Sequence, residues 1–329
     1  MSFIITEAER LKASDLHITS QEEAFWRIGG KLVPTAQELV AHWKKEKSML
    51  HAYAEKGSIR LSSFFYIHGE NISIRFFTKD IPGFFELGLP EVATELLKVR
   101  EGLVLISGPT GSGKTTTALS LLEFMLEQEA LHAITIEDPI EGSINKGQGV
   151  LQRISVGRHI ENMEEVVYNS LRYDADILLI GEIRRAETLR AALLAAETGH
   201  LVIATTHANR LGDILPSFIG RLGETNQEII RESLIQQMSG LVCQRLVPRK
   251  DGGRILLAEV LPVTEAVRAH LRKNPYGLHT YLEGIHHSQG MSLEKHAAFS
   301  IQQGHIEKDI HIPGVETKGI GRYLTYEKF

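Results

Sequence analysis

One stretch constrains the fold of this chain more than any other: residues 103–117, LVLISGPTGSGKTTT. Residues 103–107 are mostly apolar and branched, as expected for a buried strand of a parallel sheet. This pattern breaks at Gly108 into a glycine-rich turn and continues as a predicted helix from Lys114. A strand, a GxxxxGK[ST] turn and a helix in this order are typical of a P-loop.

The residue types in this loop are suited to a triphosphate. Glycines let consecutive backbone N–H groups turn inward around a phosphate, next to the positive end of the following helix. Lys114 would neutralise the β- and γ-phosphates, and the Thr115 hydroxyl would reach Mg²⁺. The predicted nucleotide-binding residues are Gly108, Pro109, Thr110, Gly111, Ser112, Gly113, Lys114, Thr115 and Thr116. A chance glycine-rich turn is the alternative, but the strand before the loop and the helix after it favour binding of a nucleoside triphosphate.

Composition bounds the class of protein. A length of 329 residues suggests two domains, and 43% hydrophobic with 23% charged residues is ordinary for a soluble protein. The formal net charge of −5 argues against a bulk nucleic-acid binder. One cysteine, Cys243, excludes an intramolecular disulfide and a CxxC zinc site, and is expected to be buried. No apolar run reaches the roughly 18 residues of a membrane span, and the start is no signal peptide, so a cytoplasmic location is expected.

Residues 1–80 predict a small α+β domain. A short helix leads into a strand that ends near Ile18, and a hairpin follows with its turn at two glycines. Residues 36–56 predict a helix, and two further strands meet at the turn His68-Gly69. The proline- and glycine-rich segment 81–94 then predicts a linker.

From about residue 95 strands and helices alternate. Strands are predicted at 103–107, 132–136, 177–181 and 201–206, and helices at 114–128 and 186–198. This alternation predicts an α/β fold with a parallel sheet covered by helices. Residues 207–262 indicate helix and then a hairpin near Pro248–Gly253, and mainly helix follows to about Gly304. Residues 311–329 carry no usable signal.

Acidic residues follow two of these strands. Glu182 comes directly after one strand, where P-loop ATPases place the acid that handles Mg²⁺ and the attacking water, so it is the predicted general base or water-orienting group. Glu137, Asp138 and Glu141 follow another strand and would hold Mg²⁺ through water and position the nucleophile. The alternatives are a strand-end carboxylate without function and an acidic Asp-Pro turn.

Two histidines bracket the strand LVIATT. His207 follows its carboxyl end, where a neutral imidazole would sense the γ-phosphate, and His200 precedes the strand. Taken alone, each would be interpreted as a structural histidine. Their positions beside a predicted catalytic edge make both candidates.

The motifs together resemble the type II/IV secretion and type IV pilus ATPase family. GPTGSGKTTT looks like its Walker A motif, TIEDPIE its Asp box, LRYDADILLIGEIR its Walker B region, TGHLVIATTHAN its His box and KASDLHI its N-terminal motif. The order is that of the family, and the resemblance covers nearly the whole chain.

Within the family, AETGHLV, QRLVPRKDGGR and EAVRAHL look most like retraction ATPases of the PilT type. Extension and secretion ATPases of the PilB/GspE type usually carry a tetracysteine zinc insert, which one cysteine cannot form. Competence ATPases of the ComGA type can also lack it and are the close alternative. The chain departs from the family's GE(I/M)RD at Arg185, from its DPD at Asp174-Ala175-Asp176, and from its LHT in THAN.

The resemblance implies a RecA-like P-loop ATPase domain over residues 95–329 and a PAS-like domain over residues 1–80. It implies ATP and Mg²⁺ as ligands without zinc, and a homohexameric ring with ATP between subunits. The ring would act on a pilus platform protein at the inner face of the cytoplasmic membrane, without direct contact to nucleic acid. Alternatives are pilus assembly, DNA uptake or secretion by the same machinery, a nucleotide-gated assembly factor with little turnover, and a nucleic-acid motor.

The resemblance also implies an arginine from the neighbouring subunit. The family supplies it from the last strands of the N-terminal domain, where Arg60 and Arg75 stand, and Arg172 is a third candidate. The alternative for each is a surface salt bridge.

Overall fold

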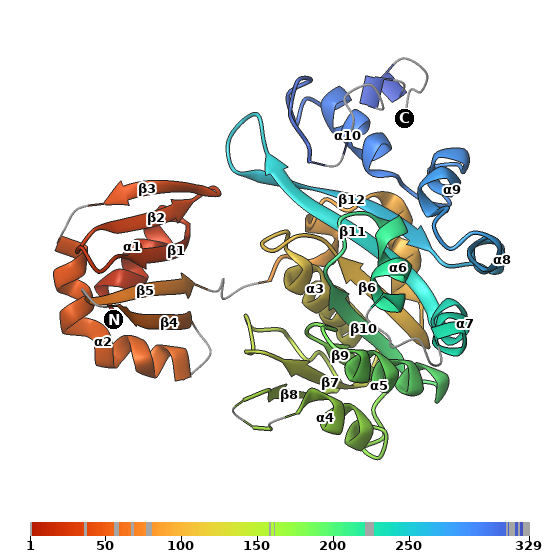
Figure 1. The fold of residues 1–329 in the computed structure, drawn as a ribbon, viewed down its shortest axis with the longest axis horizontal. Helices are drawn as coiled ribbons and strands as arrows, with labels where there is room; N and C mark the ends of the chain where they lie inside the picture. The colour runs from red at the N-terminus through yellow and green to blue at the C-terminus, as the bar shows by residue number, and fades with distance from the viewer. Residues whose placement is uncertain are drawn as a thin grey trace. The chain divides into compact units, whose positions relative to one another are not determined.

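The computed structural model describes residues 2–35, 38–55, 59–66, 69–76, 81–157, 159–160, 162–220, 227–313, 315, 320–321 and 323–324 (Figure 1). The chain divides into two compact units, one of residues 1–81 with 139–143 and one of residues 82–138 with 144–329. Each unit has its own sheet and its own hydrophobic core.

The smaller unit is an antiparallel sheet with two helices. Its elements are α1 (Phe3–Leu11), β1 (Ala13–Ile18), β2 (Ala24–Ile28), β3 (Lys31–Thr35), α2 (Glu38–Glu55), β4 (Ile59–Tyr66) and β5 (Gly69–Phe76). The strand order is β3-β2-β1-β5-β4. Gly29 and Gly30 adopt φ values of +58° and +85° between β2 and β3, so the predicted hairpin is confirmed. His68, half of the second predicted turn, lies outside the described residues, as do most of residues 311–329.

The larger unit carries the P-loop sequence. Its elements are η1 (Phe84–Glu86), η2 (Glu91–Lys98), β6 (Gly102–Ser107), α3 (Lys114–Gln128), β7 (His132–Glu137), β8 (Val150–Ser155), α4 (Met163–Ser170), β9 (Ile177–Ile180), α5 (Ala186–Glu197), β10 (Leu201–Thr206), η3 (Leu211–Asp213), α6 (Ile214–Ile219), α7 (Gln227–Gln237), β11 (Met238–Pro248), β12 (Arg254–Pro262), α8 (Glu265–Lys273), α9 (Leu278–Gly284) and α10 (Leu293–Gln302). The sheet order is β12-β11-β6-β10-β9-β7-β8. Neighbouring strands are parallel except β11 and β12, so the sheet is mixed.

The central strands are buried on both faces. Every residue of β6, β9 and β10 is buried, which explains why these strands appear in the sequence as continuous apolar runs. Helix α5 turns Leu189, Leu193 and Ala196 toward the same core, and the chain leaves it at Gly199 with φ +95°. The predicted α/β pattern of strands and helices from residue 102 to 206 is confirmed.

The segment predicted as a linker differs in the structure. Phe84 and Ala93 are buried within the larger unit, and Ser120 Oγ on α3 donates a hydrogen bond to the Pro82 carbonyl at 2.8 Å. The prolines and glycines of residues 82–94 shape two short 3₁₀ helices that pack on this unit. Composition alone does not distinguish such a segment from a free linker.

Strand β8 and helix α4 were also not predicted from sequence. Strand β8 is an edge strand whose burial is mixed, and α4 is only eight residues long.

Within the described part of the chain, no helix has the length and apolar character needed to cross a bilayer.

Cys243 gives a direct test of this packing. It lies on β11 at 2% exposure, and burial raises the pKa of its thiol to about 12. The thiolate is the reactive form of cysteine, and only a fraction on the order of 10⁻⁴ of Cys243 is ionised at pH 8. The thiol is therefore expected to react very slowly. We expect no labelling by a thiol reagent in the folded protein and full labelling in denaturant. Rapid labelling of folded protein would contradict this arrangement of β11.

Candidate functional site

The glycine-rich loop joins β6 to α3 as the sequence predicts. Strand β6 ends at Ser107, and α3 begins at Lys114 with Gly113 as its N-cap at φ +87°. Gly108 has φ +145°, and a Cβ there would lie 2.3 Å from the Gln244 carbonyl oxygen. No side chain fits at this position, so glycine is required for the loop to pass β11.

Strand β11 supports this loop. The Gln244 side chain is fully buried, and its Nε2 donates a hydrogen bond to the Ser112 carbonyl at 2.8 Å. Thr110 and Gly111 are exposed at the loop tip, while Pro109, Thr115 and Thr116 are partly buried. Sequence reasoning missed Gln244, because a strand that joins β6 from more than 100 residues away is not visible in a local pattern.

Lys114 lies inside the loop. Its Nζ donates to the Gly108 carbonyl at 2.8 Å and the Pro109 carbonyl at 3.1 Å, and lies 3.4 Å from His207 Nδ1. Burial lowers the pKa of Lys114, and the opposing charge of Glu182 offsets part of this effect.

Glu182 stands at the carboxyl end of β9, beside the loop. The Ile183 N–H donates to the Thr205 carbonyl at 2.9 Å, which ties the turn to β10. Arg184 Nη2 donates to Glu182 Oε2 at 2.8 Å, and His207 Nε2 lies 2.9 Å from Oε1. Burial would raise the pKa of Glu182, but the Arg184 hydrogen bond and the charges of Arg184 and Lys114 outweigh it and hold this pKa below its ordinary value.

His207 connects the other two groups. An ammonium group can only donate, so Nδ1 accepts from Lys114, and the ring proton of a neutral imidazole sits on Nε2, facing Glu182. The structure thus brings Lys114, His207 and Glu182 into one chain of contacts at the carboxyl ends of β6, β10 and β9.

The three acidic residues of the predicted Asp box are placed differently from one another. Glu137 is buried, accepts hydrogen bonds from Arg153 Nη2 at 2.8 Å on both carboxylate oxygens, and accepts one from Thr135. Asp138 is exposed and its charge acts on Arg184. Glu141 belongs to the segment 139–143, which is part of the smaller unit.

Arg153 accounts for a difference from the prediction at Glu137. A bidentate pair with Arg153 on β8 uses the carboxylate that the sequence assigned to Mg²⁺. The partner was missed because β8 itself was not predicted.

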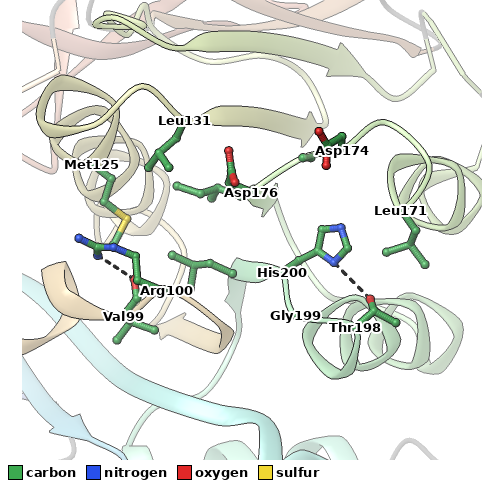
Figure 2. A pocket seen from close by; sticks show the side chains of 13 residues that line it. Val99, Arg100, Met125, Leu131, Leu171, Asp174, Asp176, Thr198, Gly199 and His200 are labelled. Carbon is green, nitrogen blue, oxygen red and sulfur yellow. Dashed lines mark hydrogen bonds between the residues drawn. The ribbon is translucent and has the colours of Figure 1, made fainter.

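His200 does not reach this edge of the sheet, which corrects its assignment as a catalytic candidate. It precedes β10, and six strand residues at roughly 3.3 Å each separate it from the carboxyl end. Its Nδ1 lies 3.0 Å from the Ala195 carbonyl and 3.2 Å from Thr198 Oγ1. His200 lines a cavity of about 370 Å³. Arg100, Asp174 and Asp176 also line this cavity (Figure 2).

The arginine candidates lie on separate elements. Arg75 on β5 donates from Nε to Asp15 Oδ1 at 2.9 Å, with the Arg75 side chain 44% exposed and Asp15 5%. Arg60 on β4 pairs with Arg75 in the strand register, and its side chain lies outside the described residues. Arg172 follows α4 and is exposed.

Several buried polar atoms around the loop lack a partner within the described residues. They are Ser112 Oγ, Thr206 Oγ1 and Gln244 Oε1. Buried polar groups are normally hydrogen-bonded, so unpaired atoms at one edge fit a site whose remaining partners come from a ligand. The chemistry of a nucleotide with Mg²⁺ agrees with this edge: backbone N–H groups, a lysine, the Thr115 hydroxyl and a carboxylate.

Fold and site together define a P-loop nucleoside triphosphatase. The chain belongs to the family described as type II/IV secretion system protein, whose model matches residues 44–252. It is therefore an ATPase with a P-loop α/β domain and a smaller N-terminal α+β domain, as the sequence motifs indicate.

Relatives across this family cover most of the chain. The uncharacterized protein YggR of Escherichia coli K12 is 32% identical over 290 residues, covering 83% of this chain and 89% of YggR. The type IV pilus retraction ATPase PilT of Pseudomonas aeruginosa is 33% identical over 215 residues, covering 65% of this chain and 62% of PilT. A crystal structure of the pilus retraction motor PilT with bound ADP matches with a TM-score of 0.72 at 31% identity, covering 92% of this chain and 93% of that one.

Arg185 stands where the family resemblance expects Asp, and the structure makes it the N-cap of α5 without a side-chain cap bond. Asp is a preferred N-cap residue and its charge suits a helix N-terminus, worth about 0.5–2 kcal/mol, while repulsion from Glu164 would offset part of this. Arg185→Asp is therefore expected to keep folding, oligomeric state and ATP hydrolysis, measured by thermal melting, light scattering and phosphate release.

Arg185→Ala is the matched control, because it removes the cation without adding a cap. If Arg185→Asp fails to fold or assemble while Arg185→Ala does not, repulsion is responsible. If both fail, Arg185 has an obligatory partner of its own and the prediction is wrong.

Proposed function

We propose that this chain is a motor ATPase that powers type IV pilus retraction. The observation that carries the hydrolytic part is the chain of contacts from Lys114 through His207 to Glu182, beside a loop shaped for phosphates. Support for retraction is the similarity to PilT, by sequence and by fold.

The proposed roles follow from charge and position. Lys114 would leave the two loop carbonyls and bind the β- and γ-phosphates, since a phosphate is the stronger acceptor. The Thr115 hydroxyl would hold Mg²⁺, which neutralises phosphate charge when it is bound. Glu182 would orient the attacking water. Its lowered pKa keeps it ionised and favours orientation of water over complete proton abstraction.

His207 would report the γ-phosphate to Glu182. When Lys114 moves to the phosphates, Nδ1 of His207 loses its donor, so nucleotide binding changes the contacts of the imidazole. Nε2 would keep the Glu182 carboxylate in place. Glu137 would act through Arg153 rather than as a direct metal ligand.

The assembly around the site is part of the proposal. We propose a homohexameric ring with ATP between subunits, a PAS-like domain over residues 1–80 and a RecA-like domain over residues 95–329. Its partner would be a pilus platform protein at the inner face of the cytoplasmic membrane. Pilus assembly, DNA uptake and secretion are the alternatives within the family.

Two experiments test this proposal. Filament counts on cells that lack the protein separate the directions of movement: excess filaments support retraction, and absent filaments show assembly instead. Steady-state ATP hydrolysis by the purified oligomer tests the motor itself, since a nucleotide-gated assembly factor would bind ATP with little turnover.

A trans arginine completes the proposed site, and Arg75 is our candidate. We expect Arg75→Ala and Lys114→Ala proteins to be inactive alone and to recover part of the hydrolysis when mixed, because some interfaces then contain one intact copy of each group. Asp15→Asn is the matched control, since it removes the same ion pair but keeps the arginine. If Asp15→Asn loses as much ATP hydrolysis as Arg75→Ala does, Arg75 has a role within its own chain. The same conclusion would follow if hydrolysis does not recover in rings that are shown to be mixed and to tolerate inactive subunits.

A further inference from the structure

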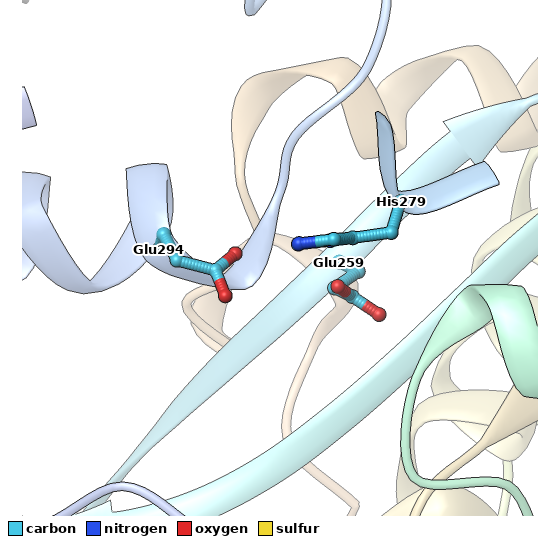
Figure 3. A group of neighbouring side chains, drawn as sticks. All are labelled: Glu259, His279 and Glu294. Atoms are coloured by element: carbon cyan, nitrogen blue, oxygen red, sulfur yellow. The ribbon is translucent and has the colours of Figure 1, made fainter. Parts of the chain in front are cut away.

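A charged cluster, buried except for the exposed His279, lies beyond the proposed site, where the residues that follow β10 meet the C-terminal elements. Figure 3 shows three of its members: Glu259 from β12, His279 from α9 and Glu294 from α10. Their ligand atoms lie within 4.8 Å of one another, the spacing of a metal site.

Arg210 occupies the position that a cation would need. Its Nε donates to Glu259 Oε1 at 2.8 Å, and its Nη1 and Nη2 donate to the two Glu294 oxygens at 2.8 and 3.0 Å. Nη2 also lies 3.0 Å from His279 Nδ1. Each potential metal ligand already contacts one guanidinium, so the cluster is an arginine clamp.

The arginine and the two glutamates of the clamp are largely buried, so their charged groups must keep a defined geometry. The side chains of Arg210, Glu259 and Glu294 are 17%, 1% and 6% exposed. Burial raises the pKa of Glu259 in spite of the Arg210 charge and the Leu211 N–H bond, so removal of the arginine alone would leave a carboxylate in an unfavourable place.

The short segment that carries the clamp also carries His207. Arg210 follows His207 closely in the chain, and the backbone around it is held by the C-terminal half of the unit. Arg245 on β11 donates to the Asn209 carbonyl at 2.9 Å, and the Leu211 N–H donates to Glu259 Oε2 at 2.7 Å. The backbone between His207 and Arg210 therefore has little freedom to move by itself.

We propose that Arg210 is a positioning residue for ATP hydrolysis: its clamp on Glu259 and Glu294 fixes the loop that holds His207 between Lys114 and Glu182. The clamp thereby couples α9 and α10 to the nucleotide site. This inference rests on the proposed role of His207.

The test separates position from stability. Arg210→Met alone leaves two buried carboxylates without their cation and is expected to lower the melting temperature. A compensated variant, Arg210→Met with Glu259→Gln and Glu294→Gln, removes the buried charge, and the amide introduced by Glu259→Gln still offers an oxygen to the Leu211 N–H. We expect it to regain much of the thermal stability while kcat stays reduced on the order of 10- to 100-fold, with unchanged binding of a fluorescent ATP analogue. Recovery of kcat together with stability would overturn the proposal.

Arg268→Met is the matched control. Arg268 on α8 is also 17% exposed and donates to the backbone carbonyls of Gln236 and Met238, but it is not part of the loop after β10. We expect its kcat to match wild type. An equal loss there would show that kcat responds to any removed buried arginine, and the proposal would be wrong.

A double-mutant cycle with His207→Ala tests the route. If Arg210 acts through His207, the compensated change has no further effect on kcat in the His207→Ala background. Additive losses would overturn the inference while leaving the role of His207 intact. If His207→Ala alone hydrolysed ATP at the wild-type rate, His207 would have no role in hydrolysis. The proposal that Arg210 positions His207 would then be wrong as well.

Discussion

Lys114→Ala is expected to abolish ATP hydrolysis. A unit charge opposite a triphosphate in a partly dry site is worth several kcal/mol, and Lys114 lies in such a site at 9% exposure. Its ammonium already sits within the loop on the Gly108 and Pro109 carbonyls, so it needs only a short movement to reach phosphate. Phosphate release by the purified oligomer measures the effect.

Two controls make this loss interpretable. Lys98→Ala removes a lysine at 70% exposure that pairs locally with Glu95, and should hydrolyse ATP as wild type does. Circular dichroism should show the same fold for both variants, since the backbone of the loop is also held by Gln244. Near wild-type hydrolysis by Lys114→Ala would remove the P-loop from the mechanism.

Fully buried strands are the part of the fold that a sequence reports best. Strands β6, β9 and β10 have no exposed position, so each appears as an apolar run, and Glu182 and His207, which follow two of them, were assigned correctly to one edge. Edge strand β8 has polar positions such as Gln152 and Arg153 and carries no such run. Missing it hid the cation that pairs with Glu137.

Strand direction explains the misplaced histidine. A run such as LVIATT has two flanks, and the sequence placed candidates on both. In a parallel sheet only the carboxyl flank joins the loop, so His207 contacts Lys114 while His200 lines a cavity elsewhere. The predicted parallel order of the strands was therefore sufficient to exclude His200.

Contacts between distant segments could not be predicted. Gln244 reaches Ser112 across 132 positions, and Arg210 reaches Glu294 across 84. Neither residue differs locally from an ordinary strand or loop residue. Their importance depends on sheet order and on the packing of α10, which local periodicity does not encode.

The second large effect is expected at Glu182. Glu182→Gln should keep ATP binding while hydrolysis falls by a factor on the order of 10²–10⁴, the usual contribution of a positioned acid–base group. Glutamine keeps an oxygen that can accept from His207 or from Arg184, so the turn after β9 should hold its shape. The lost property is the negative charge that orients and polarises water.

Binding and chemistry must be measured separately to interpret that variant. A fluorescent ATP analogue gives affinity, single-turnover phosphate release gives chemistry, and Glu129→Gln, which removes an exposed carboxylate paired with Arg100, serves as the matched control. Wild-type binding with slow chemistry would assign Glu182 to the attacking water. Loss of binding along with hydrolysis would assign it to structure or to Mg²⁺, because a group that acts only on water contributes nothing to holding the nucleotide. The contacts with His207 and Arg184 favour the first result, since they fix the carboxylate from the protein side.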